Sequence, residues 1–183
     1  MAVSAVIAVL STISAVAASE VVNFDLAWRH KLGDPKGKWF NPEYNDTAWE
    51  VVDAPHDMLI TGKHSPDNPA TQGFLARGVG AYRKHFTLPD DWQGQAVWVW
   101  FEGAFHEVEA WLNGHPLGKH VAGYTSFSFR VDQLARPGET NVLAMRVNAS
   151  TGTGWCVRAG LHPPTFGSSH PCCPPCLLTR LIA

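Results

Sequence analysis

Three stretches of the chain decide its fold: GVGAYRKHF at residues 78–86, VWVWFEGA at 97–104 and VEAWLNG at 108–114. Apolar side chains recur at every second position in the last two stretches, which is the period of a β-strand. The dipeptide Asn113-Gly114 favours a two-residue turn between paired strands. The three stretches therefore predict consecutive antiparallel β-strands.

The same pattern extends through most of the chain. Further strands are expected at residues 23–30, 51–52, 82–88, 96–101, 106–112, 117–120, 125–131 and 141–147. Turn residues separate these strands, and no long amphipathic helix interrupts them. Short strands spaced by about 8–12 residues are typical of all-β sandwiches. The fold class predicted is an antiparallel jelly-roll β-sandwich.

Details of three strands are also predicted. In residues 23–30, Phe24, Leu26 and Trp28 are expected to share one face. Residues 96–101 carry apolar side chains on both faces, which favours a central strand covered on both sides. The rings of Trp98, Trp100 and Trp111 could stack on sugars, but alternating aromatic residues on such strands more often form core. Trp49 is expected to close one end of the core.

Composition limits the classes of protein to consider. The 183 residues are 45% hydrophobic and 16% charged, which fits one ordinary globular domain. The formal net charge is −2, so the sequence lacks the basic surface that binds nucleic acid or anionic membranes. We expect neither as a partner.

Residues 1–18 are predicted to be a secretory signal peptide, followed by one domain at residues 19–150. The apolar run is short, and Ala15 and Ala17 provide an A-x-A cleavage pattern before Ala18. The absence of Lys or Arg before this run leaves a plain apolar extension as the alternative. A signal peptide implies a secreted or extracytoplasmic protein.

The last segment, residues 151–183, differs from the rest and is predicted to be a disordered tail. It holds all four cysteines, at positions 156, 172, 173 and 176. Residues 168–176 lack apolar periodicity, so they are not expected to form a packed element. The abrupt change favours a frameshifted or alternatively spliced end. A metal site formed by His170 with the last three cysteines is the weaker alternative, because prolines interrupt the spacing.

Four motifs carry a resemblance to a known family: DTAW at 46–49, APHD at 54–57, GVGAYRK at 78–84 and AWLNG at 110–114. In combination they resemble the N-terminal sugar-binding domain of glycoside hydrolase family 2, the family of β-galactosidases, β-glucuronidases and β-mannosidases. The match covers about residues 23–155. Met58 and Ala81 stand where the family usually has tryptophan.

The resemblance implies a jelly-roll domain followed by an immunoglobulin-like domain and a (β/α)₈ barrel. Retaining glycoside hydrolysis uses two carboxylates, which in this family are glutamates of the barrel. We therefore expect no catalytic residue, metal or cofactor in this chain, and no hydrolysis by this chain alone. The expected partners are a carbohydrate and the following domains. A free-standing, lectin-like carbohydrate-binding module and a non-functional truncated product are the alternatives.

The loop at residues 61–80 is the candidate binding element. Long loops without periodicity are often functional. In the family, loops of this domain can reach the mouth of the active site, and Asp67 and Asn68 are the side chains here that could contact sugar hydroxyls. A plain connector would have the same Pro, Asn and Gly content.

Other chemistry-bearing residues favour simpler interpretations. Glu107 and Glu109 share a strand face at roughly 6–7 Å, near the spacing of a catalytic pair, but two solvated carboxylates are the expected reading. His56 could join His64 at a metal ion, whereas we expect it to bond to backbone, with Asp57 capping a turn.

Two sequons make Asn45 and Asn148 candidates for N-glycosylation if the chain is secreted by a eukaryote.

Overall fold

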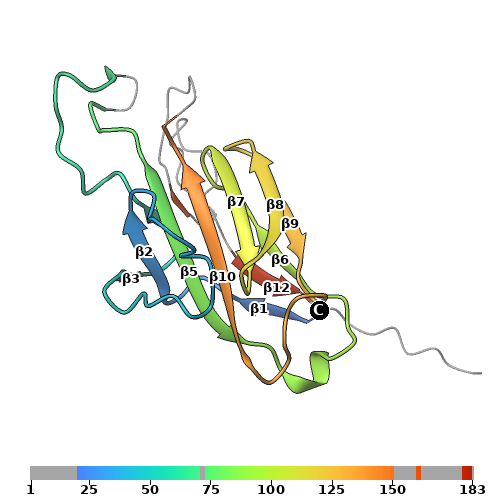
Figure 1. Cartoon of the computed structure of the whole chain (residues 1–183). Helices are drawn as coiled ribbons and strands as arrows, with labels where there is room; N and C mark the ends of the chain where they lie inside the picture. The colour runs from blue at the N-terminus through green and yellow to red at the C-terminus, as the bar shows by residue number, and fades with distance from the viewer. Residues whose placement is uncertain (1–19, 71–72, 151–159, 162–178, 183) are drawn as a thin grey trace, which may run out of the picture.

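The computed structural model describes residues 20–70, 73–150, 160–161 and 179–182, which form a sandwich of two antiparallel sheets (Figure 1). The first sheet has six strands, in spatial order β3 (Glu50–Val52), β2 (Trp28–Leu32), β5 (Val79–Thr87), β10 (Thr140–Asn148), β7 (Glu107–Leu112) and β8 (His115–Val121). The second has four, in order β1 (Val21–Asn23), β12 (Thr179–Ile182), β6 (Trp98–Phe101) and β9 (Phe127–Arg130). The all-β, antiparallel fold class is confirmed.

Two smaller elements complete the described structure. β4 (His56–Asp57) pairs with β11 (Gly160–Leu161), and η2 (Asp90–Trp92) is a short 3₁₀ turn after β5. The expected tail at 151–183 lies outside the described residues except for β11 and β12, and so do residues 1–18. Within the described ranges, no helix is long and apolar enough to cross a bilayer.

The main core lies between the two sheets, where side chains at every second position meet. β6 contributes Val99 and Phe101, which are fully buried. β7 contributes alternate residues that are buried to the same degree, and β10 does so with Leu143, Met145 and Val147. The predicted alternation is confirmed. The expectation that this strand is central is confirmed, because β6 lies between β12 and β9, but its outer face is only partly covered, since Trp98 and Trp100 are half-buried.

A second apolar cluster covers the outer face of the six-stranded sheet. Trp39 and Trp49, from the segment that joins β2 to β3, pack there on Ala81 of β5 and Ala144 of β10. Trp111 joins the margin of this cluster, with its ring stacked 5.0 Å from that of Phe40. The prediction that Trp49 closes one end of the main core is therefore wrong, while the core reading of Trp111 is confirmed.

The predicted strand at residues 23–30 is also wrong, because the chain turns sharply between β1 and β2. Ala27 has a φ of 58°, and its N–H donates to Asp53 Oδ1 at 2.7 Å. Leu26 consequently faces solvent, with 62% of its surface exposed, although Phe24 and Trp28 are buried. A bond to a distant aspartate imposes this break, which local periodicity does not reveal.

The turn at Asn113-Gly114 is as predicted. Both residues have positive φ, 50° and 84°, and Leu112 pairs with His115 across the hairpin. These angles fit the two-residue turn that the dipeptide favours.

Candidate functional site

The family motifs meet at a buried ion pair on the outer face of the six-stranded sheet. Arg83 of β5 is fully buried, and its Nε donates to Asp46 Oδ2 at 2.7 Å. The guanidinium also donates to the backbone carbonyls of Trp39 and Asn41, the latter at 2.9 Å. Arg83 thus ties the segment that carries DTAW to the strand that carries GVGAYRK. Its role is structural, because these hydrogen bonds join β5 to the segment between β2 and β3.

The Asp46 carboxylate completes this network. Oδ2 lies 2.7 Å from His85 Nε2 as well as from Arg83. Burial alone would raise the pKa of Asp46, but hydrogen bonds from His85 and Arg83 prevail and hold that pKa below its ordinary value. The carboxylate is therefore ionised and paired, as a buried charge must be.

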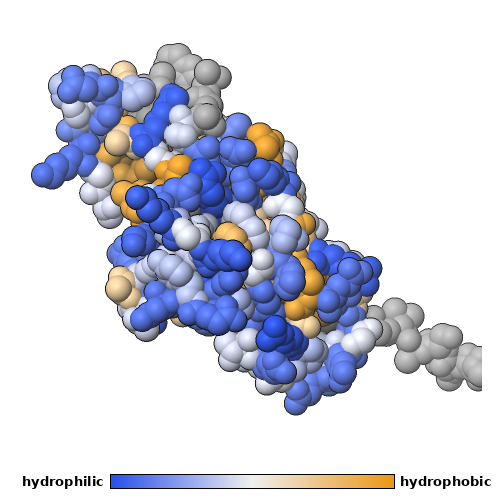
Figure 2. All heavy atoms as spheres, viewed as in Figure 1, coloured by the Kyte–Doolittle hydropathy of each residue, from blue (hydrophilic) through white to orange (hydrophobic). Residues whose placement is uncertain are grey.

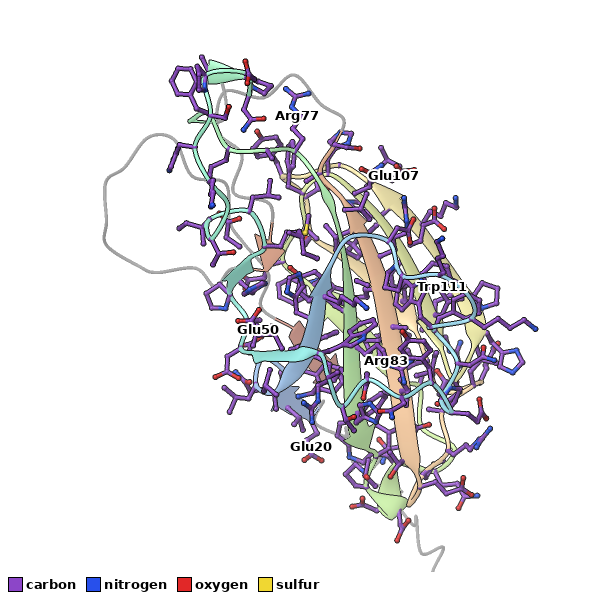
Figure 3. All side chains as sticks on the ribbon, turned by 60° about the vertical axis from the view of Figure 1, so that its left-hand side comes forward. Glu20, Glu50, Arg77, Arg83, Glu107 and Trp111 are labelled. Atoms are coloured by element: carbon purple, nitrogen blue, oxygen red, sulfur yellow. The ribbon has the colours of Figure 1, made fainter. Side chains whose placement is uncertain are left out.

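The loop at residues 61–78 projects beyond the sandwich at one end of β5 (Figure 1). Its two arms are bonded to each other: Ser65 N–H donates to Phe74 O at 3.0 Å, and His64 Nδ1 lies 2.6 Å from Gly73 O. Arg77 lies at the base of the loop, near the sheet (Figure 3). Bonds between the arms give the described part of this loop a defined shape.

The two predicted binding residues have different surroundings in this loop. Asn68 Nδ2 donates to Phe74 O at 3.0 Å, so this amide helps to close the loop. Asp67 is exposed, and its carboxylate accepts from Ser65 Oγ at 3.3 Å. Beside them Phe74 exposes 44% of its surface, over a shallow hollow shared with His64 and Pro66. Sequence reasoning missed Phe74, although an aromatic residue within a Pro/Gly/Asn loop was a signal for it.

Apolar surface also breaks the mainly hydrophilic exterior at the same end of the molecule as the loop (Figure 2). Ile60 and Leu32 are 58% and 56% exposed. A second pocket lies beside them, lined by Leu32, Met58, Leu59, Arg77 and Val79 among others. The base of the loop is thus apolar, whereas its outer part combines one aromatic ring with polar groups.

A third cluster contains His30, Glu50 and His56, from β2, β3 and β4. One ring nitrogen of each histidine and one Glu50 oxygen all lie within 4.8 Å of one another. His30 is buried on the inner face, whereas Glu50 is 70% exposed. Glu50 lies at the edge of the sheet (Figure 3). His56 Nδ1 lies 2.9 Å from the hydroxyl of Tyr82, a buried residue of β5. The cluster therefore opens to solvent on the side of Glu50.

Burial sets the ionisation of this cluster. It lowers the pKa of His30 to about 4, with a smaller contribution from the charge of His56. Burial also lowers the pKa of His56, although the carboxylates of Glu50 and Asp57 oppose the shift. It raises the pKa of the Tyr82 phenol, which stays protonated. At neutral pH both imidazoles are consequently uncharged.

The outcome for His56 and Asp57 is mixed. His56 contacts the Tyr82 side chain rather than backbone, so that expectation is wrong, and the structure groups it with His30 and Glu50 instead of His64. Asp57 Oδ1 accepts from Leu59 N–H at 3.0 Å, which confirms its role in a turn. His30 was missed in the sequence, where its one signal was a histidine at an inward-facing position of a strand.

Glu107 and Glu109 have polar partners on the outer face of β7. Asn148 Nδ2 donates to Glu107 Oε2 at 3.0 Å, and Lys119 Nζ lies 2.9 Å from Glu109 Oε1. Both carboxylates are half-buried and bonded to neighbouring side chains, rather than simply solvated.

The two sequons also differ. Asn45 is exposed in the segment after β2, and its Oδ1 accepts from Thr47 Oγ1 at 2.7 Å. Asn148 lies at the end of β10, half-buried, and its Nδ2 is bonded to Glu107. Asn45 is therefore the more exposed of the two candidate side chains.

The fold and the buried motif residues define a class of accessory β-sandwich domain. The family described as "Beta-galactosidase second all-beta domain" matches residues 36–153. The chain belongs to this family, and its relatives are enzymes of glycoside hydrolase family 2.

Individual relatives agree with this assignment. A β-galactosidase of Bacteroides ovatus, BoGH2A, is 37% identical over 75% of this chain, and a β-glucuronidase of Formosa agariphila is 32% identical over 71%. A crystal structure of a β-glycosidase from Bacteroides vulgatus superposes with a TM-score of 0.72 at 30% identity, over 89% of this chain. The chain spans 16% and 14% of the two curated relatives and 20% of that structure.

Proposed function

We propose that this chain is a non-catalytic, carbohydrate-binding domain of a β-galactosidase-type protein of glycoside hydrolase family 2. The family match to an accessory all-β domain is the observation that carries this proposal. The charged groups that the sequence marked as candidates for catalysis have structural partners instead. Hydrolysis of an O-glycosidic bond would belong to a barrel domain next to this one, in a protein secreted by means of residues 1–18.

The loop at residues 61–78 is the proposed contact with sugar. Carbohydrate sites combine an apolar ring face with a few polar groups that fix orientation. Phe74 offers the ring, Asp67 offers an exposed carboxylate for sugar hydroxyls, and Asn68 keeps the loop closed. In this proposal Asp67 and Phe74 contact the sugar, whereas Asn68 holds the loop in shape through its bond to Phe74 O.

Titration with galactosides, glucuronides and mannosides, followed by NMR, tests this proposal. We expect weak binding that Phe74→Ala reduces about fivefold, which corresponds to the loss of about 1 kcal/mol of ring contact. Asp67→Asn should reduce it by a similar factor. Leu26→Ala and Asp91→Asn, which change exposed residues outside this loop, serve as matched controls and should leave the affinity unchanged.

Two results would overturn the proposal. One is an affinity that the two loop variants leave unchanged, and the other is release of a chromogenic aglycone from aryl glycosides by this chain, abolished by Glu107→Gln or Glu109→Gln. Strong glycan binding by the isolated chain would instead favour a free-standing, lectin-like module.

A further inference from the structure

We propose that His30, Glu50 and His56 form a binding site for a divalent transition-metal ion of the zinc class. Two imidazoles and one carboxylate are a common ligand set for Zn²⁺, with a fourth position left to water or another ligand. Neither the family match nor the relatives' names point to this site. It is separate from the loop proposed to contact sugar.

The distances lie within reach of coordination. His30 Nδ1 and Glu50 Oε2 are 3.8 Å apart, and the whole set lies within 4.8 Å. Zinc bonds of roughly 2.0–2.2 Å in a tetrahedron place ligand atoms about 3.4 Å apart. A contraction of about 1.4 Å at most is therefore required, from 4.8 Å to about 3.4 Å. A change of rotamer at Glu50 can bring its carboxylate closer to His30 Nδ1, because this side chain is 70% exposed.

His30 is the most informative member of the set. It is 95% buried, yet its Nε2 has no hydrogen-bond partner in the described part of the chain. The contact of Nδ1 with Glu50, at 3.8 Å, is too long for a hydrogen bond. Nδ1 is the ring nitrogen that faces Glu50, so a metal ion bound there would give this buried ring a strong bond, while Nε2 would stay beside Gly80.

The surroundings hold both imidazoles in place. Tyr82 Oη lies 2.9 Å from His56 Nδ1, so a metal on the other ring nitrogen would leave Nδ1–H to donate to Oη. Gly80 makes room for His30, because a Cβ there would overlap the Met58 sulfur and lie 3.2 Å from His30 Nε2. The rings of His30 and His56 have centroids 4.6 Å apart. The histidines are thus fixed, while the carboxylate can move.

The ordinary alternative is that the two rings merely pack against each other and against Tyr82. That arrangement requires no role for Glu50, which is exposed at the sheet edge. The effect of changing Glu50 therefore separates a metal site from simple packing.

Isothermal titration of the full chain with ZnCl₂ tests the proposal, after alkylation of the four cysteines removes them as ligands. We expect one equivalent to bind. Glu50→Gln should weaken binding at least tenfold without unfolding the protein, because the side chain is exposed. Glu43→Gln, an exposed glutamate of the preceding segment, and His115→Ala, an exposed histidine of the β7–β8 hairpin, should leave the affinity unchanged.

Spectroscopy of the metal-loaded protein reports the coordinating atoms directly. Co²⁺ should give the visible absorption of a four- or five-coordinate ion with nitrogen and oxygen ligands, and histidine resonances of the Zn²⁺-loaded protein should shift for two residues. His56→Gln should abolish both signals; if this variant fails to fold, Glu50→Gln decides. Absence of binding, or an affinity unchanged in folded Glu50→Gln, would overturn the proposal.

Discussion

Arg83 and His30 are buried polar side chains on opposite faces of the same sheet, and they differ in how fully they are hydrogen-bonded. Arg83, on the outer face, is paired with Asp46 and with backbone carbonyls of the covering segment. His30, on the inner face opposite Tyr82, has an Nε2 without a hydrogen-bond partner among the described residues. The bonds of Arg83 explain how the covering segment is held to the sheet, whereas the His30 ring is held by packing and turns its Nδ1 toward the exposed Glu50.

The largest loss of stability is expected from a substitution of Arg83 on the outer face. Arg83→Met should lower the free energy of unfolding by about 3–5 kcal/mol, because Asp46 and the three carbonyls that accept from Arg83 then lose this partner. Urea unfolding measures this loss. Arg136→Met, a matched change of an arginine that is 57% exposed, should cost no more than about 0.5 kcal/mol. Equal losses of stability for the two variants would show that the buried bonds of Arg83 do not hold the outer face together.

Acid should weaken the same network, by less, because Arg83 stays charged and keeps its carbonyl partners. The folded-state pKa of Asp46 lies below its ordinary value of 3.8, so the unfolded chain binds this proton first as pH falls. The stabilising contribution is present above pH 3.8 and is lost as pH falls through the folded pKa. Urea midpoints followed from about pH 5 to about pH 2 should fall less steeply in Asp46→Asn, and parallel curves would contradict the assignment.

The smallest loss of stability is expected from a substitution of Tyr82 on the inner face. Tyr82→Phe removes the hydroxyl that contacts His56 and should cost about 1 kcal/mol in metal-free protein, the usual contribution of one hydrogen bond. Urea unfolding in the presence of a chelator measures it. Tyr44→Phe, which keeps the ring beside Trp49, is the matched control and should be near neutral. A cost above that of Arg83→Met would reverse the comparison.

Sequence by itself determined the strands β6 and β7 and the turn between β7 and β8. Alternation at 97–101 and 108–112 is a local consequence of strand geometry, since successive side chains point to opposite faces and one face must be buried. The positive φ angles of Asn113 and Gly114 follow equally from residue type. The family motifs were also readable, because they are contiguous in sequence.

Tertiary structure alone decided which distant residues meet. Asp46 lies 37 positions before Arg83, and neither residue's neighbours reveal that they pair. The turn at Ala27 depends on Asp53, and the cluster of His30, Glu50 and His56 depends on three strands from separate parts of the chain. Local periodicity reports burial of one strand at a time, whereas partners across the sheet are set by strand order and register, which only the folded chain defines.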